Sequence, residues 1–386
     1  MNVLILPSWY TIPENPIAGI FFKEQAIAIR RKFEQKNNDD KVFIVFIEEF
    51  GIQNIKTYFK RKKRLILEED GILTMRTKFF RIPKLHKFNL YLGARCVERN
   101  VKFFSKILGV NFDLVHIHSA LNAGIWYSLS NLTIPYVITE HSSAYSRNLI
   151  SSQKKVFLPN VFEKARKIIS VGNGLANEIS KYTKKEVDVV FNIVTNLFLD
   201  RNVEQKKNKQ ITFFSLGLNL VVKGFDILLF AFERFISNGY EGKLIIAGLN
   251  DTEIKKILEL GINPEVMKCI ELKGQLDRNS VFMYMCNCDC FALVSRYETF
   301  GVVFAEAMYC GKPVIATRTG GPDSFVNNSN GLLVNVEDIE ETSEALMYMA
   351  NNISKYDSEQ IKKYAIDNFS PDVICEKLIN IYNSVL

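Results

Sequence analysis

The chain has 386 residues, of which 47% are hydrophobic and 24% charged, and its net charge is +7. This length favours two domains over one, and the composition is typical of a soluble globular protein with enough apolar residues for two cores. No apolar run reaches the ~18 residues that a membrane-spanning helix needs. The first residues, MNVLILPSWY, lack a basic leader and a small-residue cleavage site, so we interpret them as a buried strand of a cytoplasmic protein.

Short apolar runs alternate with longer amphipathic stretches along the first half, which is typical of a parallel sheet with crossover helices. The expected strands are 3–6, 42–47, 114–117, 136–139, 167–171 and 187–191, and the expected helices include 22–32, 91–108 and 162–165. The polar, lysine-rich segment 202–210 interrupts this pattern and predicts an interdomain linker.

The same alternation restarts after the linker. Strands are expected at 211–216, 243–247, 270–273, 290–293, 314–316 and 331–334, and helices at 225–238, 251–260, 279–286, 302–310 and 339–351. The pattern predicts an α/β protein with two Rossmann-like domains, 1–201 and 211–370.

The positive charge is concentrated in residues 56–106, which hold 15 basic and 4 acidic residues. Eight aromatic residues are interleaved with them. Such a segment suits an anionic membrane surface or a phosphorylated lipid, and nucleic acid is a weaker competing partner that we do not expect. The alternative is a solvated basic face whose aromatic side chains point into the core.

The seven cysteines are odd in number and lie in apolar segments, which predicts reduced thiols. Cys286, Cys288 and Cys290 have the period-2 spacing of one face of a strand approach, and no histidine lies nearby in the sequence. We therefore expect buried structural thiols and no metal site.

The segment 295–307 has the pattern of a ligand-binding loop between a buried strand and a helix that begins near Phe300. The first N–H groups of such a helix suit a diphosphate, and Gly301 permits close approach of the backbone. Glu298 and Glu306 flank this anion site and suit the hydroxyls of a sugar and a ribose. Taken singly, Glu298 also fits a helix N-cap and Glu306 a solvated helix face.

The block SRYETFGVVFAEAMYCGKPVIATRTGGPDSFV, with its E-x7-E spacing, resembles the signature of glycosyltransferase family 4. The resemblance covers nearly the whole chain and is densest from 214 to 334. It implies a retaining glycosyltransferase of the GT-B fold, in which two Rossmann-like domains face across a cleft. It also implies that the last helix, about 371–386, returns to the first domain.

The resemblance implies roles for several residues of the second half. Glu298 contacts the hydroxyls of the donor sugar, Glu306 holds the ribose, and the backbone of Phe300, Gly301 and Val302 receives the diphosphate. Lys223 neutralises the leaving diphosphate. Gly274 and Leu276 line the base pocket, although Gly274 also fits a plain strand-end turn. These implied donor-site residues are Glu298, Glu306, Phe300, Gly301, Val302, Lys223, Gly274 and Leu276.

One position departs from the family. An arginine usually follows the glycine that ends the first strand of the C-terminal domain, whereas here Leu218 follows Gly217. The missing cation would weaken leaving-group stabilisation by roughly 2–4 kcal/mol if nothing replaced it. We expect another basic residue to compensate.

In the first half, the resemblance implies that Gly19, just before a helix, approaches the donor diphosphate. A structural helix-start glycine is the alternative. His141 follows a strand end, where ligands bind, and matches the family histidine of the reaction centre. His118 closes the preceding strand and is a possible acceptor-side residue, although a strand-end histidine is more often structural.

The expected reaction moves a sugar from a nucleoside-diphosphate donor to a hydroxyl acceptor, with Glu298, His141 and Lys223 as catalytic residues and without cofactor or metal. Many family members extend lipid-linked surface polysaccharides, which suggests that acceptor class and peripheral association with the inner face of the membrane. Two rivals keep the fold: a nucleotide-sugar epimerase or hydrolase, and a non-catalytic nucleotide-sugar-binding subunit. A nicotinamide dehydrogenase is disfavoured because neither half has G-x-G-x-x-G after its first strand.

Overall fold

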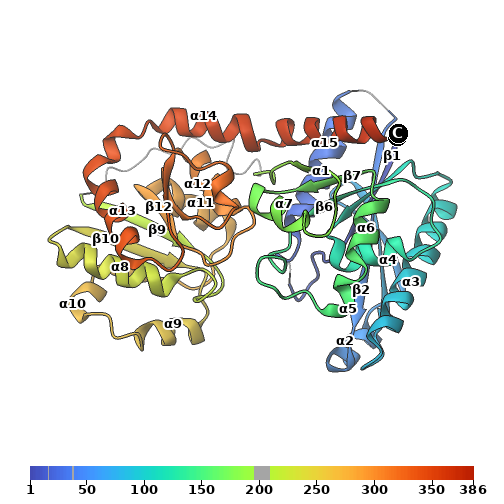
Figure 1. Cartoon of the computed structure of the whole chain (residues 1–386), viewed down its shortest axis with the longest axis horizontal. Helices are drawn as coiled ribbons and strands as arrows, with labels where there is room; N and C mark the ends of the chain where they lie inside the picture. The colour runs from blue at the N-terminus through green and yellow to red at the C-terminus, as the bar shows by residue number, and fades with distance from the viewer. Residues whose placement is uncertain (16, 37–38, 195–208) are drawn as a thin grey trace. The chain divides into compact units, whose positions relative to one another are not determined.

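A computed structural model describes residues 1–15, 17–36, 39–194 and 209–386. The chain forms two compact units, each built on its own sheet (Figure 1). The first unit comprises Met1–Val171, Leu175–Ile193 and Pro371–Leu386, and the second comprises Gly172–Gly174 and Val194–Ser370. The first unit therefore ends near Ile193, earlier than the expected 201. Most of the expected linker, 202–208, lies outside the described residues.

The first unit contains an eight-stranded sheet of order β3-β4-β2-β1-β5-β6-β7-β8. All neighbouring strands are parallel except β3 and β4. The strands are β1 (Asn2–Pro7), β2 (Lys41–Phe50), β3 (Arg64–Glu69), β4 (Ile72–Phe80), β5 (Leu114–His118), β6 (Tyr136–Glu140), β7 (Lys167–Ser170) and β8 (Val187–Val189). The central strands β1, β5 and β6 are almost wholly buried, as continuous apolar runs predict for parallel strands covered on both faces.

Helices cover both faces of this sheet. They are α1 (Ile20–Gln35), α2 (Ile55–Lys60), α3 (His86–Leu108), α4 (Ile125–Ser128), α5 (Ser152–Lys155), α6 (Leu158–Lys164), α7 (Asn173–Ile179) and α15 (Pro371–Val385), with short turns η1 (Ile52–Asn54) and η2 (Ala120–Gly124). The C-terminal helix α15 packs against α1 (Figure 1), and side chains of both helices share one apolar cluster with β1 and β2. Burying each large side chain of this cluster contributes about 1.5–3 kcal/mol, which anchors the C-terminal helix to the first unit.

The hairpin β3–β4 corrects the sequence analysis, which expected no strand between 48 and 113. The turn has Asp70 and Gly71 at φ 50° and 78°, which is the pattern of a type I′ hairpin turn. Asp-Gly between two apolar runs is itself a strong hairpin signal, but the basic residues of the segment obscured it. Residues 56–106 therefore form α2, the hairpin and most of α3.

The second unit contains a six-stranded, fully parallel sheet of order β11-β10-β9-β12-β13-β14. The strands are β9 (Ile211–Leu216), β10 (Gly242–Ala247), β11 (Ile270–Leu272), β12 (Cys290–Leu293), β13 (Val314–Thr317) and β14 (Gly331–Val334). All six expected strands are confirmed to within a residue at each end. The order, numbered along the chain from β9, is 3-2-1-4-5-6, which is that of a doubly wound nucleotide-binding domain.

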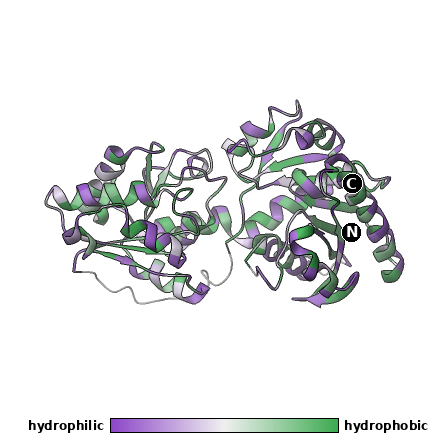
Figure 2. Cartoon of the chain, turned by 90° about the horizontal axis from the view of Figure 1, so that it is seen from below, coloured by the Kyte–Doolittle hydropathy of each residue, from purple (hydrophilic) through white to green (hydrophobic). Residues whose placement is uncertain are grey.

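The helices of the second unit begin at recognisable caps. They are α8 (Phe225–Ser237), α9 (Asp251–Leu258), α10 (Pro264–Met267), α11 (Arg278–Asn287), α12 (Val302–Tyr309), α13 (Ile339–Asn352) and α14 (Ser358–Phe369), with short turns η4 (Pro322–Ser324) and η5 (Ile353–Lys355). Asn250 and Glu253 form a capping box at α9, and Asp277 caps α11. Figure 2 shows the strands of both units as mainly hydrophobic, with hydrophilic residues on the outer helix faces. Within the described residues, no helix is both long enough and apolar enough to span a bilayer.

The three neighbouring cysteines do not share one strand face. Cys286 lies in α11, Cys288 is the C-cap of that helix, and Cys290 begins β12. All three are buried, and burial raises the pKa of the Cys288 thiol to about 12. In the described part of the chain, no three His, Cys, Asp or Glu side chains are grouped as metal ligands.

Candidate functional site

The strands β9 and β12 mark the point where the strand order of the second sheet reverses. β10 and β11 continue the sheet on one side, and β13 and β14 continue it on the other. Loops beyond the carboxyl ends of two such strands diverge and leave a crevice, which is where open α/β sheets bind ligands. The loop after β9 carries Lys223, and the loop after β12 carries Glu298. Two of the predicted catalytic residues therefore lie at this switch point.

The structure brings these two side chains into contact. Lys223 Nζ lies 2.6 Å from Glu298 Oε2, and the side chains are only 24% and 13% exposed. The ammonium and the carboxylate thus neutralise each other beside the strand ends. A diphosphate entering this place would meet a cation, and a sugar hydroxyl would meet a charged acceptor.

Two glycines bring the loop of Lys223 close to the sheet. Gly224 has φ 65°, and a Cβ atom at that position would lie 2.0 Å from the carbonyl oxygen of Val294 at the end of β12. A Cβ on Gly217 would lie 2.6 Å from Cγ of Lys223. Only glycine fits both positions, so the backbone itself fixes where the lysine begins.

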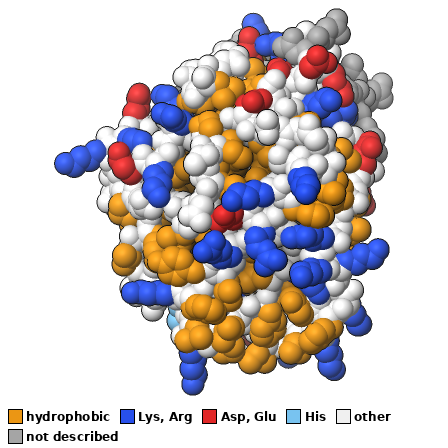
Figure 3. All heavy atoms as spheres, turned by 90° about the vertical axis from the view of Figure 1, so that its right-hand side faces the viewer, with side chains coloured by type: hydrophobic (Ala, Val, Ile, Leu, Met, Phe, Trp, Pro, Cys, Tyr) orange, Lys and Arg blue, Asp and Glu red, His pale blue; other side chains and the backbone are white. Residues whose placement is uncertain are grey.

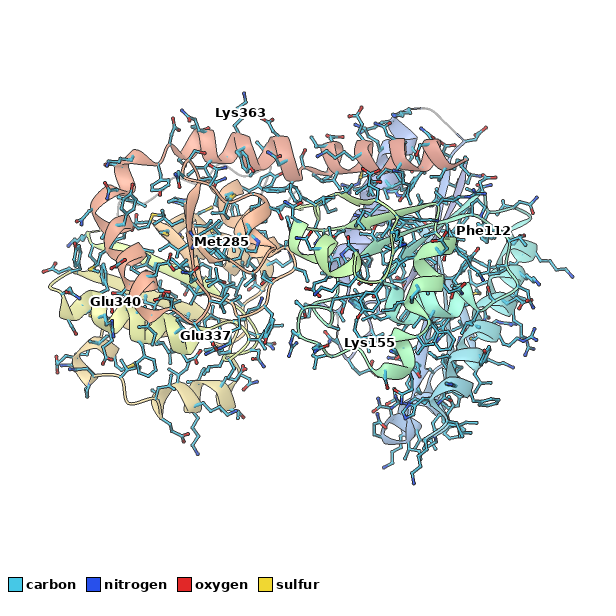
Figure 4. All side chains as sticks on the ribbon, viewed as in Figure 1. Phe112, Lys155, Met285, Glu337, Glu340 and Lys363 are labelled. Carbon is cyan, nitrogen blue, oxygen red and sulfur yellow. The ribbon has the colours of Figure 1, made fainter. Side chains whose placement is uncertain are left out.

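Arg296 holds the two loops together. Its guanidinium donates to both carboxylate oxygens of Asp226 at 2.8 Å each and to the carbonyl oxygen of Val221 at 2.6 Å. Its Nε atom donates to Glu337, labelled in Figure 4, at 2.7 Å. Its backbone N–H also donates to the carbonyl oxygen of Val222 at 2.9 Å. These bonds connect the segment before α8 to the segment that carries Glu298.

The sequence analysis gave Arg296 and Asp226 no role. They lie 70 positions apart, and only the adjacency of β9 and β12 makes them neighbours. Leu218, in place of the family arginine, is 53% exposed. Arg296 is an unsuitable replacement because Asp226 and Glu337 already balance its charge.

The helix α12 begins at Val302, the first residue of the expected helix 302–310, and Gly301 is its N-cap with φ 85°. In the first turn, Phe304 N donates to the carbonyl oxygen of Gly301 at 3.0 Å, whereas the N–H groups of Val302 and Val303 have no acceptor inside the helix. The start of the helix also concentrates positive potential. The side chain of Phe300 is 1% exposed and packs on Phe325 and Phe369, so only its backbone suits a ligand role. Val302 is half-buried as the first helical residue.

Glu306 is buried in α12 rather than on a solvated helix face, with 8% exposure. Arg278, at the start of α11, places Nη2 3.4 Å from Glu306 Oε1. Sequence reasoning did not identify Arg278. It is a second basic side chain next to a predicted donor-binding acid, and it is 40% exposed.

Gly274 and Leu276 belong to the loop between β11 and α11. The carbonyl oxygen of Gly274 accepts a hydrogen bond from Gly248 N at 3.0 Å, which joins the loops after β10 and β11. Gly274 is exposed and Leu276 is half-buried. Both lie at the carboxyl edge of the sheet, two strands away from β9.

In the first unit, Gly19 is the N-cap of α1 with φ 65°, so it is a helix-start glycine in the left-handed region. A Cβ atom there would lie 2.9 Å from the carbonyl oxygen of Trp9. The loop between β1 and α1 is fixed to β5 because Ser8 N donates to His118 O at 3.0 Å. Gly19 therefore lies in the loop that follows β1, at the point where the strand order of the first sheet reverses between β1 and β5. This position corresponds to the switch point between β9 and β12 in the second sheet.

His118 and His141 are in contact at the carboxyl ends of β5 and β6. Nδ1 of His118 lies 3.1 Å from Nε2 of His141, and the ring of Phe22 stacks on His118 at 4.6 Å. Nε2 of His118 is buried and has no hydrogen-bond partner. Burial lowers the pKa of His141 to about 3 and that of His118 well below its usual value, so both rings are neutral near pH 7.

A third histidine, His116, is structural. Its Nδ1 pairs with the hydroxyl of Tyr382 at 2.6 Å and its Nε2 with the hydroxyl of Thr139 at 2.7 Å. Burial lowers the pKa of His116 to about 3. This histidine therefore ties α15 to the sheet.

Glu140 is a further residue that the sequence analysis passed over, although it precedes His141. Its buried carboxylate accepts the backbone N–H groups of Ala120 at 2.8 Å, His141 at 2.8 Å and Ser142 at 2.9 Å. Desolvation raises the pKa of Glu140 although these bonds oppose that shift. Glu140 thus fixes the backbone on both sides of the His118–His141 contact.

Comparison with known proteins identifies the family. The model described as Glycosyltransferase Family 4 matches residues 58–195, and the model described as Glycosyl transferases group 1 matches residues 198–367. The chain belongs to glycosyltransferase family 4. It is therefore a glycosyltransferase, as the resemblance of the 295–326 block implied.

Relatives of this family 4 protein extend across most of its length. An uncharacterised glycosyltransferase of Methanocaldococcus jannaschii is 29% identical over 309 residues, which cover 77% of this chain and 81% of the relative. The capsular polysaccharide biosynthesis glycosyltransferase CapM of Staphylococcus aureus is 28% identical over 243 residues, covering 61% and 60%. The solved structure of HepE from Anabaena has a TM-score of 0.72 at 16% identity and covers all of both chains. The family 4 protein has the GT-B fold, as predicted.

Proposed function

We propose that this glycosyltransferase moves a sugar from a nucleoside-diphosphate donor to a hydroxyl acceptor, with retention at the anomeric carbon. The observation that carries the proposal is the Lys223–Glu298 pair beside the start of α12, at the switch point of a doubly wound sheet. This arrangement combines a cation, free helix N–H groups and a charged hydroxyl acceptor, which are the groups that a sugar diphosphate requires.

In the proposed reaction, negative charge develops on the leaving diphosphate and positive charge on the sugar ring. Lys223 and the first turn of α12 stabilise the diphosphate, and Glu298 orients the sugar through its hydroxyls. Glu306 accepts hydrogen bonds from the ribose hydroxyls. No separate metal is needed in this scheme because protein groups carry the charge.

The neutral histidines fit the same proposal. A neutral imidazole can donate or accept a hydrogen bond at a sugar hydroxyl without placing a second positive charge beside the cationic ring. We assign this role to His141. His118, in hydrogen-bond contact with it, fixes the orientation of its ring.

Two relatives support the donor and acceptor classes. Solved structures of HepE from Anabaena contain UDP and UDP-glucose, which favours a uridine nucleotide as the first donor to test. CapM of Staphylococcus aureus is named for capsular polysaccharide biosynthesis, which favours a glycan of the cell surface as the acceptor class. We propose that this acceptor is linked to a lipid.

The experiment that tests the proposal is incubation with nucleoside-diphosphate sugars, with and without a lipid-linked acceptor, while nucleotide release is measured. The configuration of the product is read from its anomeric proton coupling. Inversion would contradict the retaining mechanism. Full turnover without an acceptor would show that the enzyme hydrolyses the donor and does not transfer the sugar.

The surface formed by residues 56–106 suits contact with a membrane, where a lipid-linked acceptor would lie. Phe104 is buried, but Phe59, Phe88 and Tyr91 are 75%, 49% and 52% exposed, so the aromatics of this segment do not all point into the core. Figure 3 shows hydrophobic and basic side chains interleaved on this face of the first unit. An apolar and basic surface of this kind suits an anionic bilayer, and we propose that it docks the enzyme at the inner face of the membrane.

Vesicle flotation tests the docking surface. We expect the protein to float with vesicles that contain anionic lipid and not with neutral vesicles. Phe59→Asp should reduce flotation severalfold, whereas Tyr348→Asp, at an exposed aromatic of α13 in the second unit, should not. Equal flotation with both vesicle types would reject the docking surface.

A further inference from the structure

A cavity of about 460 Å³ lies in the first unit, on the sheet face that α1 only partly covers. We call it the hairpin pocket, and it is lined by Thr11, Ile12, Pro13, Ile20, Lys23, Phe46, Glu48, Arg61, Lys62, Leu65, Leu67, Glu69, Arg76, Thr77 and Lys78. These residues come from the β1–α1 loop, α1, β2, the loop between α2 and β3, β3 and β4. The volume lies within the range of small-molecule sites, about 300–1,000 Å³. None of the catalytic residues proposed above lines it.

The register of the strands explains the floor of the pocket. Arg76 in β4 is opposite both Phe46 in β2 and Leu65 in β3, and Lys78 is opposite Glu48. Residues paired across a sheet point to the same face, and alternate residues along a strand share that face. Charged groups and leucines are therefore presented on one surface.

The charged side chains of the pocket are mainly cations. Five basic residues line the pocket against two acidic ones, Glu48 and Glu69. Arg76 pairs with Glu69 at 2.6 Å and Arg61 with Glu48 at 3.5 Å, and outside the lining Arg61 also pairs with Glu14 and Lys23 with Asp70. Among the described residues, Lys62 and Lys78 are therefore the lining cations that no carboxylate pairs with. Lys78 donates to the carbonyl oxygens of Tyr58 and, at 2.7 Å, of Arg61, which holds its ammonium beside the segment of Arg61 and Lys62. An anion would complete the charge balance.

Another part of the lining is aliphatic. It consists of Leu65 and Leu67 of β3, Ile20 of α1 and Pro13 of the β1–α1 loop. Leu65 is 37% exposed, which leaves apolar surface in contact with water. Covering such surface with a hydrocarbon chain is favourable, whereas a free inorganic anion would leave it exposed.

We propose that the hairpin pocket binds a phosphate ester of an aliphatic alcohol, with the phosphate beside Lys62 and Lys78 and the chain along Leu65 and Leu67. The cavity equals the volume of about 15 water molecules, which corresponds to a phosphate with a short hydrocarbon chain. Identifying this ligand as the lipid end of the acceptor rests on the proposed function, but its binding does not.

Binding is tested by calorimetry with geranyl phosphate below its micellar concentration. We expect geranyl phosphate to bind at least tenfold more tightly than either geraniol or inorganic phosphate, because the pocket recognises both ends. Dihexanoyl phosphatidic acid distinguishes the source of the ligand. Tighter binding of geranyl phosphate indicates a single-chain carrier, and tighter binding of the phosphatidic acid indicates a bulk membrane lipid.

Two matched pairs of variants locate the site. Lys62 lines the pocket and its neighbour Lys63, which is also exposed, does not, so Lys62→Glu should weaken binding at least tenfold and Lys63→Glu less than twofold. Leu65 and Leu73 are both 37% exposed in the same hairpin but project from opposite faces. Leu65→Asp should therefore weaken binding at least tenfold, whereas Leu73→Asp should leave it within twofold.

The outcomes are separable from those of the proposed function. Equal losses of affinity in the two variants of either pair would overturn the pocket assignment. So would a folded wild-type protein that binds neither geranyl phosphate nor dihexanoyl phosphatidic acid. Donor turnover measured on the same preparation reports the transferase proposal independently. Vesicle flotation, in which Lys62→Glu and Lys63→Glu should behave alike, reports the membrane surface.

Discussion

Lys223 Nζ and Glu298 Oε2 are 2.6 Å apart, and they come from loops that follow the neighbouring strands β9 and β12. Without a ligand the carboxylate balances the ammonium. A sugar diphosphate would offer Lys223 a second anion and Glu298 a set of hydroxyls. The Lys223–Glu298 contact could then be replaced by one contact of Lys223 with the diphosphate and one of Glu298 with the sugar. This exchange leads to predictions about each partner.

Glu298→Gln should lower kcat/KM by about tenfold to a hundredfold, because a neutral amide replaces a charged hydrogen-bond acceptor worth about 1.5–3 kcal/mol. Nucleotide release from the donor measures the effect. Glu271→Gln is the control, since Glu271 also pairs with lysines of the second unit but lies within β11. Unaltered turnover in Glu298→Gln would remove the assigned role.

Lys223→Met should lower kcat by about 10²–10³, the cost of losing one preorganised group that stabilises developing charge. Addition of EDTA to the wild-type protein should leave turnover unchanged, because we propose that protein groups carry the diphosphate charge. Lys243→Met should retain activity, because Lys243 lies at the amino end of β10, away from the carboxyl edge of the sheet. If EDTA abolishes turnover and Mg²⁺ restores it, a metal supplies the charge instead.

Arg296→Met should destabilise the second unit by about 2 kcal/mol and raise KM for the donor, because Asp226 loses a bidentate partner and the two loops lose their connection. Urea unfolding and donor titration measure the two effects. Arg318→Met removes an exposed arginine paired with Glu341 at 3.2 Å and should cost less than about 1 kcal/mol. Equal costs for both variants would show that Arg296 is an ordinary surface ion pair.

The sequence predicted the second unit well because its strands are continuous apolar runs and its site residues lie in compact motifs. Glu298 could be chosen in advance from the loop that follows a recognisable strand, and Lys223 from the resemblance to family 4. The Arg296–Asp226 contact could not, because it depends on which strands become neighbours. In the first unit, the Asp70-Gly71 signal was present but was outweighed by the charge of the surrounding segment. Glu140 gave no signal because its role depends on the backbone groups folded around it.

The first unit should lose stability as the pH falls below about 6.5. The pKa of His116 falls from about 6.5 in the unfolded chain to about 3 in the fold, so below pH 6.5 the unfolded chain binds more protons and the free energy of unfolding decreases. Each such histidine contributes about 1.4 kcal/mol per pH unit in that window, or about 2 kcal/mol between pH 6.5 and pH 5.

The variant His116→Gln isolates this contribution. Its loss of stability between pH 7.5 and pH 5 should be smaller than that of the wild type by about 2 kcal/mol, because the other buried titratable groups, His118, Glu140 and His141, are present in both proteins. Both tryptophans, Trp9 and Trp126, belong to the first unit, so their fluorescence follows its unfolding. An identical pH dependence in His116→Gln would contradict a neutral buried His116.

Gly224→Ala and Gly239→Ala separate backbone strain from steric conflict. Both glycines have positive φ, 65° and 85°, but a Cβ atom at Gly239 meets open space. Gly239→Ala should therefore cost only the strain of the left-handed region, about 1–2 kcal/mol. Gly224→Ala adds a Cβ atom 2.0 Å from the carbonyl oxygen of Val294, so the loop must move away from β12.

That movement would displace Lys223, which directly precedes Gly224. We expect Gly224→Ala to lose more stability than Gly239→Ala and, in addition, to reduce nucleotide release about as strongly as Lys223→Met. Circular dichroism during urea unfolding and the donor assay on the folded protein measure the two effects separately. Normal turnover in a folded Gly224→Ala protein would show that the close approach of this loop to β12 is unnecessary for placing the lysine.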